Sequence, residues 1–319
     1  MLDSEALYED GLDAIREGRL DDARAIGEQL IEMRYSGGFE VLGLVERDEG
    51  DLDAAIAILE QGVEKASTAW LLWQLLGNSY SDAGRPEEAA GAYEHALGCD
   101  GVDVSSVRLN QATLAFRSGL RDEGFRFLDE VVDPALHLYR ESLRLGEWER
   151  EERYAEILPR AAALLTEADD DADPDVLAQL VVRAAWAKHK LGGARDDVVR
   201  ELLVAYAYDP ICDDAQWAIR EVEDRRADDT RQFEVLLEAT HPAEPALRYF
   251  VSFTTVATTK EEAAELARRH EEAAGGIGLR TEEVEQGDPI EDYPIGVYRR
   301  SGRQFFDPES EVEDADVER

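Results

Sequence analysis

The sequence predicts a mainly α-helical protein, a stack of helix hairpins followed by a small module that combines strands with one helix. The first observation is a repeat. Turn segments of similar sequence begin at Gly18, Gly50, Gly84 and Gly119, at intervals of 32, 34 and 35 residues. A repeat of this length is typical of solenoids, in which each unit buries its apolar side against its neighbours. The second observation is that the apolar period changes near residue 245 from that of helices to the alternation of strands.

The stretch from Leu71 to Gly101 shows one repeat unit clearly. Its large apolar residues recur three or four positions apart, which places them on one face of a helix. Glycine and alanine occur where the two helices of a hairpin approach each other, since a small residue allows close contact. Gly84 is expected to end the first helix, and Pro86 suits the first position of the second. The pattern comprises Trp73, Leu76, Gly77, Tyr80, Ala89 and Tyr93.

With these residues the chain resembles the tetratricopeptide repeat (TPR) family, whose unit is a helix–turn–helix of about 34 residues. The resemblance is strong over the third repeat and extends to the second, where Phe39 and Leu42 stand in the places of Trp73 and Leu76. It weakens in the fourth repeat, where Arg108 takes the place of Trp73. The resemblance implies a TPR-type α-solenoid, a right-handed superhelix of helix hairpins.

The chain is expected to divide into four parts. Residues 1–133 form four TPR-like repeats, and residues 134–240 form degenerate helical repeats and capping helices, with two helices between Asp213 and Thr240. Residues 245–307 form a small β-α-β-β module. Because about 60 residues is near the lower limit for an independent core, this module is expected to pack against the last helices. Residues 308–319 form an acidic tail that is expected to be disordered.

The pattern within the small module predicts its elements. Leu247 to Thr254 alternates between apolar and polar residues, which indicates a strand. Lys260 to Ala274 has the period of an amphipathic helix. Leu279 to Glu285 and Ile295 to Tyr298 are predicted strands, and Gln304 to Phe306 is a candidate for one more.

The charge of the chain is strongly unbalanced. Acidic residues outnumber basic ones by 73 to 34, which gives a net charge of −39. The excess is spread over all the expected helices rather than gathered in one segment. Because molar salt screens charges over a few ångströms, this distribution predicts adaptation to a salt-rich cytoplasm, such as that of haloarchaea. An acidic surface made for a basic partner is the alternative interpretation.

Features that would direct the chain to a membrane or to an oxidising compartment are not visible in the sequence. The N-terminal residues are acidic and no apolar run follows them, and no stretch reaches the length of a membrane span. Cys99 and Cys212 are the only cysteines, too few for a disulfide framework. We therefore expect a cytoplasmic protein.

The sequence shows no catalytic motif, so it predicts neither enzymatic activity nor a cofactor. Gly275 to Gly278 follows an expected helix and precedes an expected strand, the reverse of the order in a dinucleotide-binding turn. The acidic segment Asp169 to Asp175 has Pro174 where a calcium loop needs glycine. His95 and Cys99 lie four residues apart, but two ligands do not make a metal site. We expect a solvated histidine and a small buried cysteine there.

The resemblance implies that partners bind on the concave face, which is lined by the first helix of each hairpin. The function predicted first is therefore a non-enzymatic scaffold that holds a protein or peptide segment in this groove. A clamp for a C-terminal carboxylate would need clustered cations, and Glu40 and Gln74 stand where cations would be required. The expected groove positions are Glu40, Leu44 and Arg47 in the second repeat, Gln74, Asn78 and Ser81 in the third, and Leu109, Thr113 and Arg117 in the fourth.

An alternative is a regulatory protein that binds RNA or nucleotides through the C-terminal sheet while the repeats recruit a partner. Aromatic residues and arginines on a small sheet could stack on bases. The competing account is that the aromatics form the core of the module and the arginines a solvated edge, and the acidic chain as a whole repels phosphate. We therefore do not expect nucleic acid as a partner. The residues concerned are Tyr249, Phe250, Phe253, Tyr298, Phe305 and Phe306, with Arg248, Arg299, Arg300 and Arg303.

Overall fold

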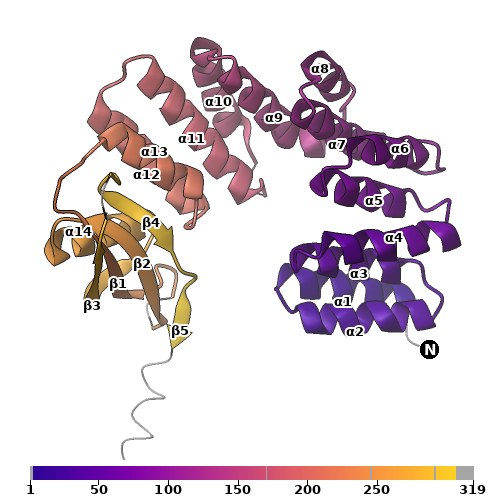
Figure 1. Ribbon diagram of the computed structural model, residues 1–319, viewed down its shortest axis with the longest axis horizontal. Helices are drawn as coiled ribbons and strands as arrows, with labels where there is room; N and C mark the ends of the chain where they lie inside the picture. The colour runs from indigo at the N-terminus through magenta and orange to yellow at the C-terminus, as the bar shows by residue number, and fades with distance from the viewer. Residues whose placement is uncertain (1–2, 170, 245, 291, 307–319) are drawn as a thin grey trace, which may run out of the picture. The chain divides into compact units, whose positions relative to one another are not determined.

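The computed structural model describes residues 3–169, 171–244, 246–290 and 292–306. It divides into two compact units, Met1–Arg140 and Glu141–Arg319. Helix hairpins fill the first unit, and the second contains further helices and a small antiparallel sheet near the C-terminus (Figure 1). The predicted fold class, a mainly α chain of TPR-like hairpins followed by a small module with a sheet, is confirmed. The predicted acidic tail, residues 308–319, lies outside the described residues.

Four helix hairpins follow one another in the first unit. Their turns contain Gly18, Gly50, Gly84 and Gly119, each with a φ between 70° and 84°. Glycine adopts this left-handed conformation without strain, so the first helix of each hairpin ends at the turn that the sequence predicts. The helices are α1 (Ser4–Arg16), α2 (Leu20–Glu32), α3 (Gly37–Asp48), α4 (Leu52–Lys65), α5 (Trp70–Asp82), α6 (Pro86–Leu97), α7 (Val104–Arg117) and α8 (Arg121–Asp129), followed by a 3₁₀ turn at Pro134–Leu136.

The third hairpin packs as its sequence pattern predicts. Leu76 and Tyr93 are buried in one apolar cluster with residues of the neighbouring repeats. At Gly77 the helices are so close that a Cβ atom would lie 2.5 Å from Cε1 of Tyr93. Trp73 is only partly buried, because its ring lies at the edge of the cluster and stacks on His95, with ring centroids 4.5 Å apart. A close approach of this kind leaves no space for a side chain at Gly77.

Replacing Gly77 by leucine should therefore force α5 and α6 apart. We expect the free energy of unfolding to fall by roughly 1–3 kcal/mol, the usual cost of overpacking. Chemical denaturation measures the change. The matched control is Gly91→Ala on the exposed side of α6, where a Cβ atom would meet nothing within 4 Å. That variant should gain about 0.5–1 kcal/mol, since alanine favours a helix. Equal stabilities for Gly77→Leu and the parent would contradict the assigned register.

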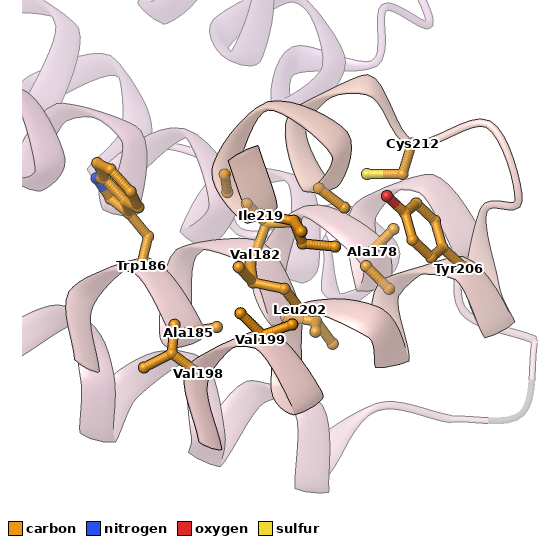
Figure 2. Packing of buried hydrophobic residues seen from close by; sticks show 14 of the residues in the cluster. Ala178, Val182, Ala185, Trp186, Val198, Val199, Leu202, Tyr206, Cys212 and Ile219 are labelled. Atoms are coloured by element: carbon orange, nitrogen blue, oxygen red, sulfur yellow. The ribbon is translucent and has the colours of Figure 1, made fainter. Parts of the chain in front are cut away.

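Helices also form the first part of the second unit. Val182, Leu202 and Ile219 come from three successive helices and point toward one another in its apolar core (Figure 2). Residues in this core are buried at helical spacing, which is the pattern that the sequence predicts for degenerate repeats. The helices are α9 (His137–Arg150), which spans the boundary between the units, α10 (Tyr154–Glu167), α11 (Pro174–Lys190), α12 (Arg195–Tyr208) and α13 (Asp213–Glu223).

The sheet has the strand order β3-β1-β2-β4, and β5 also pairs with β2. All pairs are antiparallel. The face that contains Phe233, Val251 and Phe253 is buried, and α14 packs on the sheet. The elements are β1 (Arg231–Thr240), β2 (Arg248–Ala257), α14 (Lys260–Ala273), β3 (Ile277–Pro289), β4 (Gly296–Arg300) and β5 (Gln304–Phe306).

The prediction of a helix in the segment that ends at Thr240 was wrong. Residues 231–240 form β1, so the sheet begins before residue 245 and the module has one more strand before its helix than predicted. Phe233, Val235, Leu237 and Ala239 alternate along this segment and are all buried, which is the period of a strand. β1 lies between β2 and β3 and pairs with both, so distant segments satisfy its backbone groups.

Within the second unit the sheet module packs against the preceding helices. The rings of Tyr206 on α12 and His270 on α14 lie 3.8 Å apart between centroids. Arg269 on α14 donates a hydrogen bond of 2.8 Å to Glu223 on α13. Apolar and charged contacts therefore both join the module to α12 and α13. Among the described residues, every helix is too short or too polar to cross a bilayer.

Candidate functional site

The predicted groove positions lie on the first helices of the second, third and fourth hairpins, α3, α5 and α7. These helices contact one another in succession, α3 with α5 and α5 with α7 (Figure 1). On each helix successive positions are three or four residues apart, which places them on one side of the helix. We call the side formed by these nine positions the inner face.

An ion-pair network connects all three helices of the inner face. Arg47 of α3 donates a hydrogen bond of 2.8 Å to Oδ2 of Asp82, and Arg117 of α7 donates one of 2.9 Å to Oδ1. Arg117 also donates to the hydroxyl of Ser81 at 3.3 Å. Burial alone would raise the pKa of Asp82, but the two guanidinium groups outweigh it and the pKa is lowered. The Asp82 carboxylate therefore neutralises Arg47 and Arg117, two cations that could otherwise bind a ligand carboxylate.

Two other predicted groove residues are buried and bridge neighbouring repeats. Glu40 is 7% exposed and accepts a hydrogen bond of 2.7 Å from the hydroxyl of Tyr8 on α1. Burial raises the pKa of Glu40, and the hydrogen bond from Tyr8 opposes this shift. Gln74 is equally buried and donates a hydrogen bond of 2.8 Å to Ser106 on α7. These residues fix the spacing of successive repeats.

The remaining positions are more accessible. Asn78 is half-buried and its Oδ1 accepts a hydrogen bond of 2.8 Å from the hydroxyl of Tyr93. Its Nδ2 has no partner among the described residues, so this amide can still donate. Within the described part of the chain, the hydroxyl of Thr113 donates its one hydrogen bond to the carbonyl of Leu109 in its own helix, at 3.1 Å. Leu44 and Leu109 are half-buried apolar side chains.

The structure thus divides the predicted groove residues into two kinds. Glu40, Arg47, Gln74, Ser81 and Arg117 brace one repeat against the next, whereas Leu44, Asn78, Leu109 and Thr113 keep a group available to a ligand. Three partners in these contacts were not predicted: Tyr8, Asp82 and Ser106. Asp82 directly follows Ser81 and lies 35 residues from both Arg47 and Arg117, which is one repeat length, so a search of the repeats for opposite charges would have found it.

Three of the residues considered for the nucleic-acid alternative donate hydrogen bonds to one buried carboxylate. Glu271 is 0% exposed and accepts hydrogen bonds from Tyr249 at 2.7 Å, from Arg300 Nε at 2.9 Å and from Arg303 Nη2 at 2.9 Å. Nη2 of Arg300 also lies 2.8 Å from Glu271 Oε2, close enough for an ion pair but outside hydrogen-bonding geometry. We call Glu271, Tyr249, Arg300 and Arg303 the buried charge cluster.

The other residues of that alternative have contacts as well. Arg248 pairs with Glu238, and Phe250 stacks on Phe306 with ring centroids 4.7 Å apart. Tyr298 donates a hydrogen bond to the carbonyl of Pro294. Of the four arginines considered, only Arg299 is exposed. The other three are held by carboxylates of the protein itself.

The histidine and cysteine considered as metal ligands lie in ordinary packing environments. His95 is exposed and stacks on Trp73. The thiol of Cys99 lies 3.3 Å from the carbonyl of His95, and the residue is half-buried rather than buried. In the part of the chain that the structure describes, no three histidine, cysteine, aspartate or glutamate side chains are grouped closely enough to hold a metal ion.

Comparison with known proteins gives likenesses at the level of structure only. No family model matches the sequence, and no curated protein matches it. A thermophilic TPR protein of Thermus thermophilus is similar over 45% of this chain and 82% of its own, with 24% identity and a TM-score of 0.41. The TPR2AB domain of yeast Sti1, in complex with pHSP90, is similar over 69% of this chain and 83% of its own, with 17% identity and a TM-score of 0.32. Because these scores are low, the description of the fold rests on the helices and turns of this chain itself.

Proposed function

We propose that this protein is a non-enzymatic scaffold whose inner face, on α3, α5 and α7, binds a segment of a protein partner. The observation that carries the proposal is the bracing of this face. Hydrogen bonds from Tyr8 to Glu40 and from Gln74 to Ser106, together with the network around Asp82, connect α1, α3, α5 and α7 in succession. A surface held in one geometry loses little conformational entropy on binding, which favours its use for recognition.

The chemistry of the accessible positions favours a segment with apolar side chains and a free backbone or side-chain acceptor. Leu44 and Leu109 offer apolar contact area, and Nδ2 of Asn78 can donate a hydrogen bond. Asp82 already neutralises Arg47 and Arg117, so a ligand carboxylate would have to displace it. We therefore propose an extended or helical segment in the groove rather than a C-terminal carboxylate as the bound group.

The setting we propose is a salt-rich cytoplasm. The net charge of −39 is spread through both units and is not confined to the inner face. Such a charge would repel itself in dilute buffer and is screened at high ionic strength. This supports halophilic adaptation as the origin of the acidic composition.

Affinity capture from a native lysate at high salt tests the proposed inner face. We expect Leu109→Glu to reduce capture of the specific partner by about tenfold or more, since it places a charge in an apolar contact. The matched control is Leu191→Glu, which makes the same substitution at a side chain that is 53% exposed and belongs to the second unit. A partner retained equally by Leu109→Glu and by the parent protein would refute the proposal.

A further inference from the structure

A hollow lies in the first unit, among α6, α7 and α8. Its volume is about 330 Å³. The floor is formed by α7 and the two walls by α6 and α8. We call it the outer groove, and its lining is Pro86, Glu87, Ala90 and Glu94 from α6, Gln111, Leu114 and Ala115 from α7, Ser118 and Leu120 from the turn, and Glu123 and Phe127 from α8.

The outer groove exists because the fourth repeat lacks one large side chain of the third. The turn glycines of these repeats are 35 residues apart, and at this spacing Gln111 and Ala115 take the places of Leu76 and Tyr80. In the third repeat Tyr80 is 9% exposed, and its hydroxyl donates a hydrogen bond of 2.6 Å to Glu60 of α4. Tyr80 therefore fills the space between its repeat and the preceding one. Ala115 leaves the corresponding space open.

The outer groove is separate from the inner face. Gln111, Ala115 and Ser118 recur at helical spacing on one side of α7. The inner-face residues Leu109 and Thr113 lie on the opposite side, because a residue advances by about 100° along a helix of 3.6 residues per turn. A ligand in the outer groove would not touch the inner face, so the two surfaces can be tested independently.

The outer groove is apolar inside and acidic at its rim. Leu114, Ala115 and Phe127 supply its apolar lining, and the titratable side chains in the lining are three glutamates. Glu94 accepts a hydrogen bond from Gln111, whereas Glu87 and Glu123 are exposed and form no ion pair with any described residue. Two carboxylates are thus available on opposite walls of one apolar hollow.

Two arginines contact the ring of Phe127, one of the lining residues. Arg108 lies 5.4 Å from the centroid of Phe127 and forms an ion pair of 2.7 Å with Glu130. Arg126 lies 4.8 Å from the same centroid. Both are absent from the lining itself, so the opening keeps its negative charge.

We propose that the outer groove binds a short basic amphipathic helix of another protein. One large apolar side chain of that helix enters the space above Ala115, and flanking lysines or arginines meet Glu87 and Glu123. The floor from Gln111 to Ser118 is about 10 Å long at 1.5 Å per residue, which suits two helical turns.

Charge excludes two other occupants that the chain itself could offer. Residues 308–319 are acidic and would be repelled by the rim. A second copy of the chain has the same excess of acidic residues, 73 against 34 basic ones, so its surface complements the acidic rim poorly. Charge complementarity therefore favours a basic segment of a different protein.

Fluorescence anisotropy with a synthetic peptide tests this proposal. The probe is a labelled peptide of about 14 residues with leucines on one helical face and lysines beside them, a length near the limit for an isolated helix. The decisive variant is Ala115→Tyr, which restores the side chain found in the third repeat and leaves every charge in place. We expect it to weaken binding about tenfold or more, since it removes the site for one large apolar side chain, with no loss of thermal stability.

A second variant tests the rim without altering the interior. We expect Glu87→Lys combined with Glu123→Lys to weaken binding of the same peptide about tenfold. The matched control is Glu28→Lys combined with Glu32→Lys, which makes the same charge change at exposed positions of α2. A peptide in which glutamate replaces each lysine should not bind.

Two results would overturn the proposal. If Ala115→Tyr binds the lysine peptide as tightly as the parent protein does, attraction to the acidic chain as a whole explains the binding. If the control pair on α2 weakens binding as much as the rim pair does, the charges at the groove have no special role. Neither result bears on the inner face, because the probe and the variants concern the other side of α7.

Discussion

Replacing Glu271 by alanine should lower the free energy of unfolding of the second unit by about 3–5 kcal/mol, the usual cost of removing one partner from a buried ion pair. Glu271 is fully buried and is the shared acceptor for Tyr249, Arg300 and Arg303. Its removal leaves the guanidinium of Arg300, a residue that is 4% exposed, without a counter-charge. Chemical denaturation measures the loss.

Two further variants separate the effect of burial at Glu271 from the effect of its charge. Glu265→Ala removes a glutamate from the same helix, but one whose side chain is 71% exposed and whose ion pair is with Arg268. We expect that change to cost less than about 1 kcal/mol, since exposed ion pairs contribute little. Glu271→Gln keeps the shape of the side chain and removes its charge, so it should fall between the two. A Glu271→Ala variant as stable as Glu265→Ala would show that the buried charge cluster does not hold the sheet to α14.

The second unit should also lose stability in acid through His270. Burial, followed by the charges of Arg300 and Arg269, lowers the pKa of this histidine from 6.5 to about 3. Its side chain lies between Tyr206 and Phe253, and neither ring nitrogen has a hydrogen-bond partner in the described structure. Between pH 6.5 and about 3, His270 therefore stays neutral in the folded protein, whereas the same histidine is protonated in the unfolded chain.

The sign of the effect follows from this difference. The full contribution of neutral His270 is present above pH 6.5 and is lost as the pH falls toward 3. The free energy of unfolding should decrease by about 1.4 kcal/mol per pH unit within that window, a loss of a few kcal/mol in total. The carboxylates of the chain also titrate over this pH range and change its stability. The effect of His270 must therefore be measured as the difference in unfolding free energy between the parent protein and a variant without this histidine.

His270→Phe is the matched variant, because it keeps an aromatic ring beside Tyr206 and removes the titrating group. Both proteins carry the same carboxylates, so the difference between their unfolding free energies isolates the histidine. We expect the parent protein to lose stability relative to His270→Phe as the pH falls from 6.5 toward 3. A difference that does not change with pH would mean that His270 can be protonated inside the folded protein.

The local rules of the repeat made the first unit predictable. The first helix of each hairpin ends at a glycine whose positive φ lets the chain turn, and Gly77 faces Tyr93 at the close approach of α5 and α6. Such features depend on residues within one hairpin, so they can be recognised from spacing alone. The segment at 231–240 alternates as a strand does, but Phe233, Leu236 and Leu237 are also three and four residues apart, which suggested a helix. Its pairing with β2 and β3, which lie elsewhere in the chain, decides between the two.

The sequence by itself determined that helix hairpins repeat here, where they turn, which residues close each hairpin, and that a module with strands follows. Only the tertiary structure decided how the polar groups on those helices are used. Glu40, Gln74 and Arg47 look alike as candidate ligand contacts in the sequence, but each finds a partner about one repeat away. The reason is physical: a hydrogen bond between helices depends on their separation and rotation, which packing sets, whereas a turn depends on a few adjacent residues.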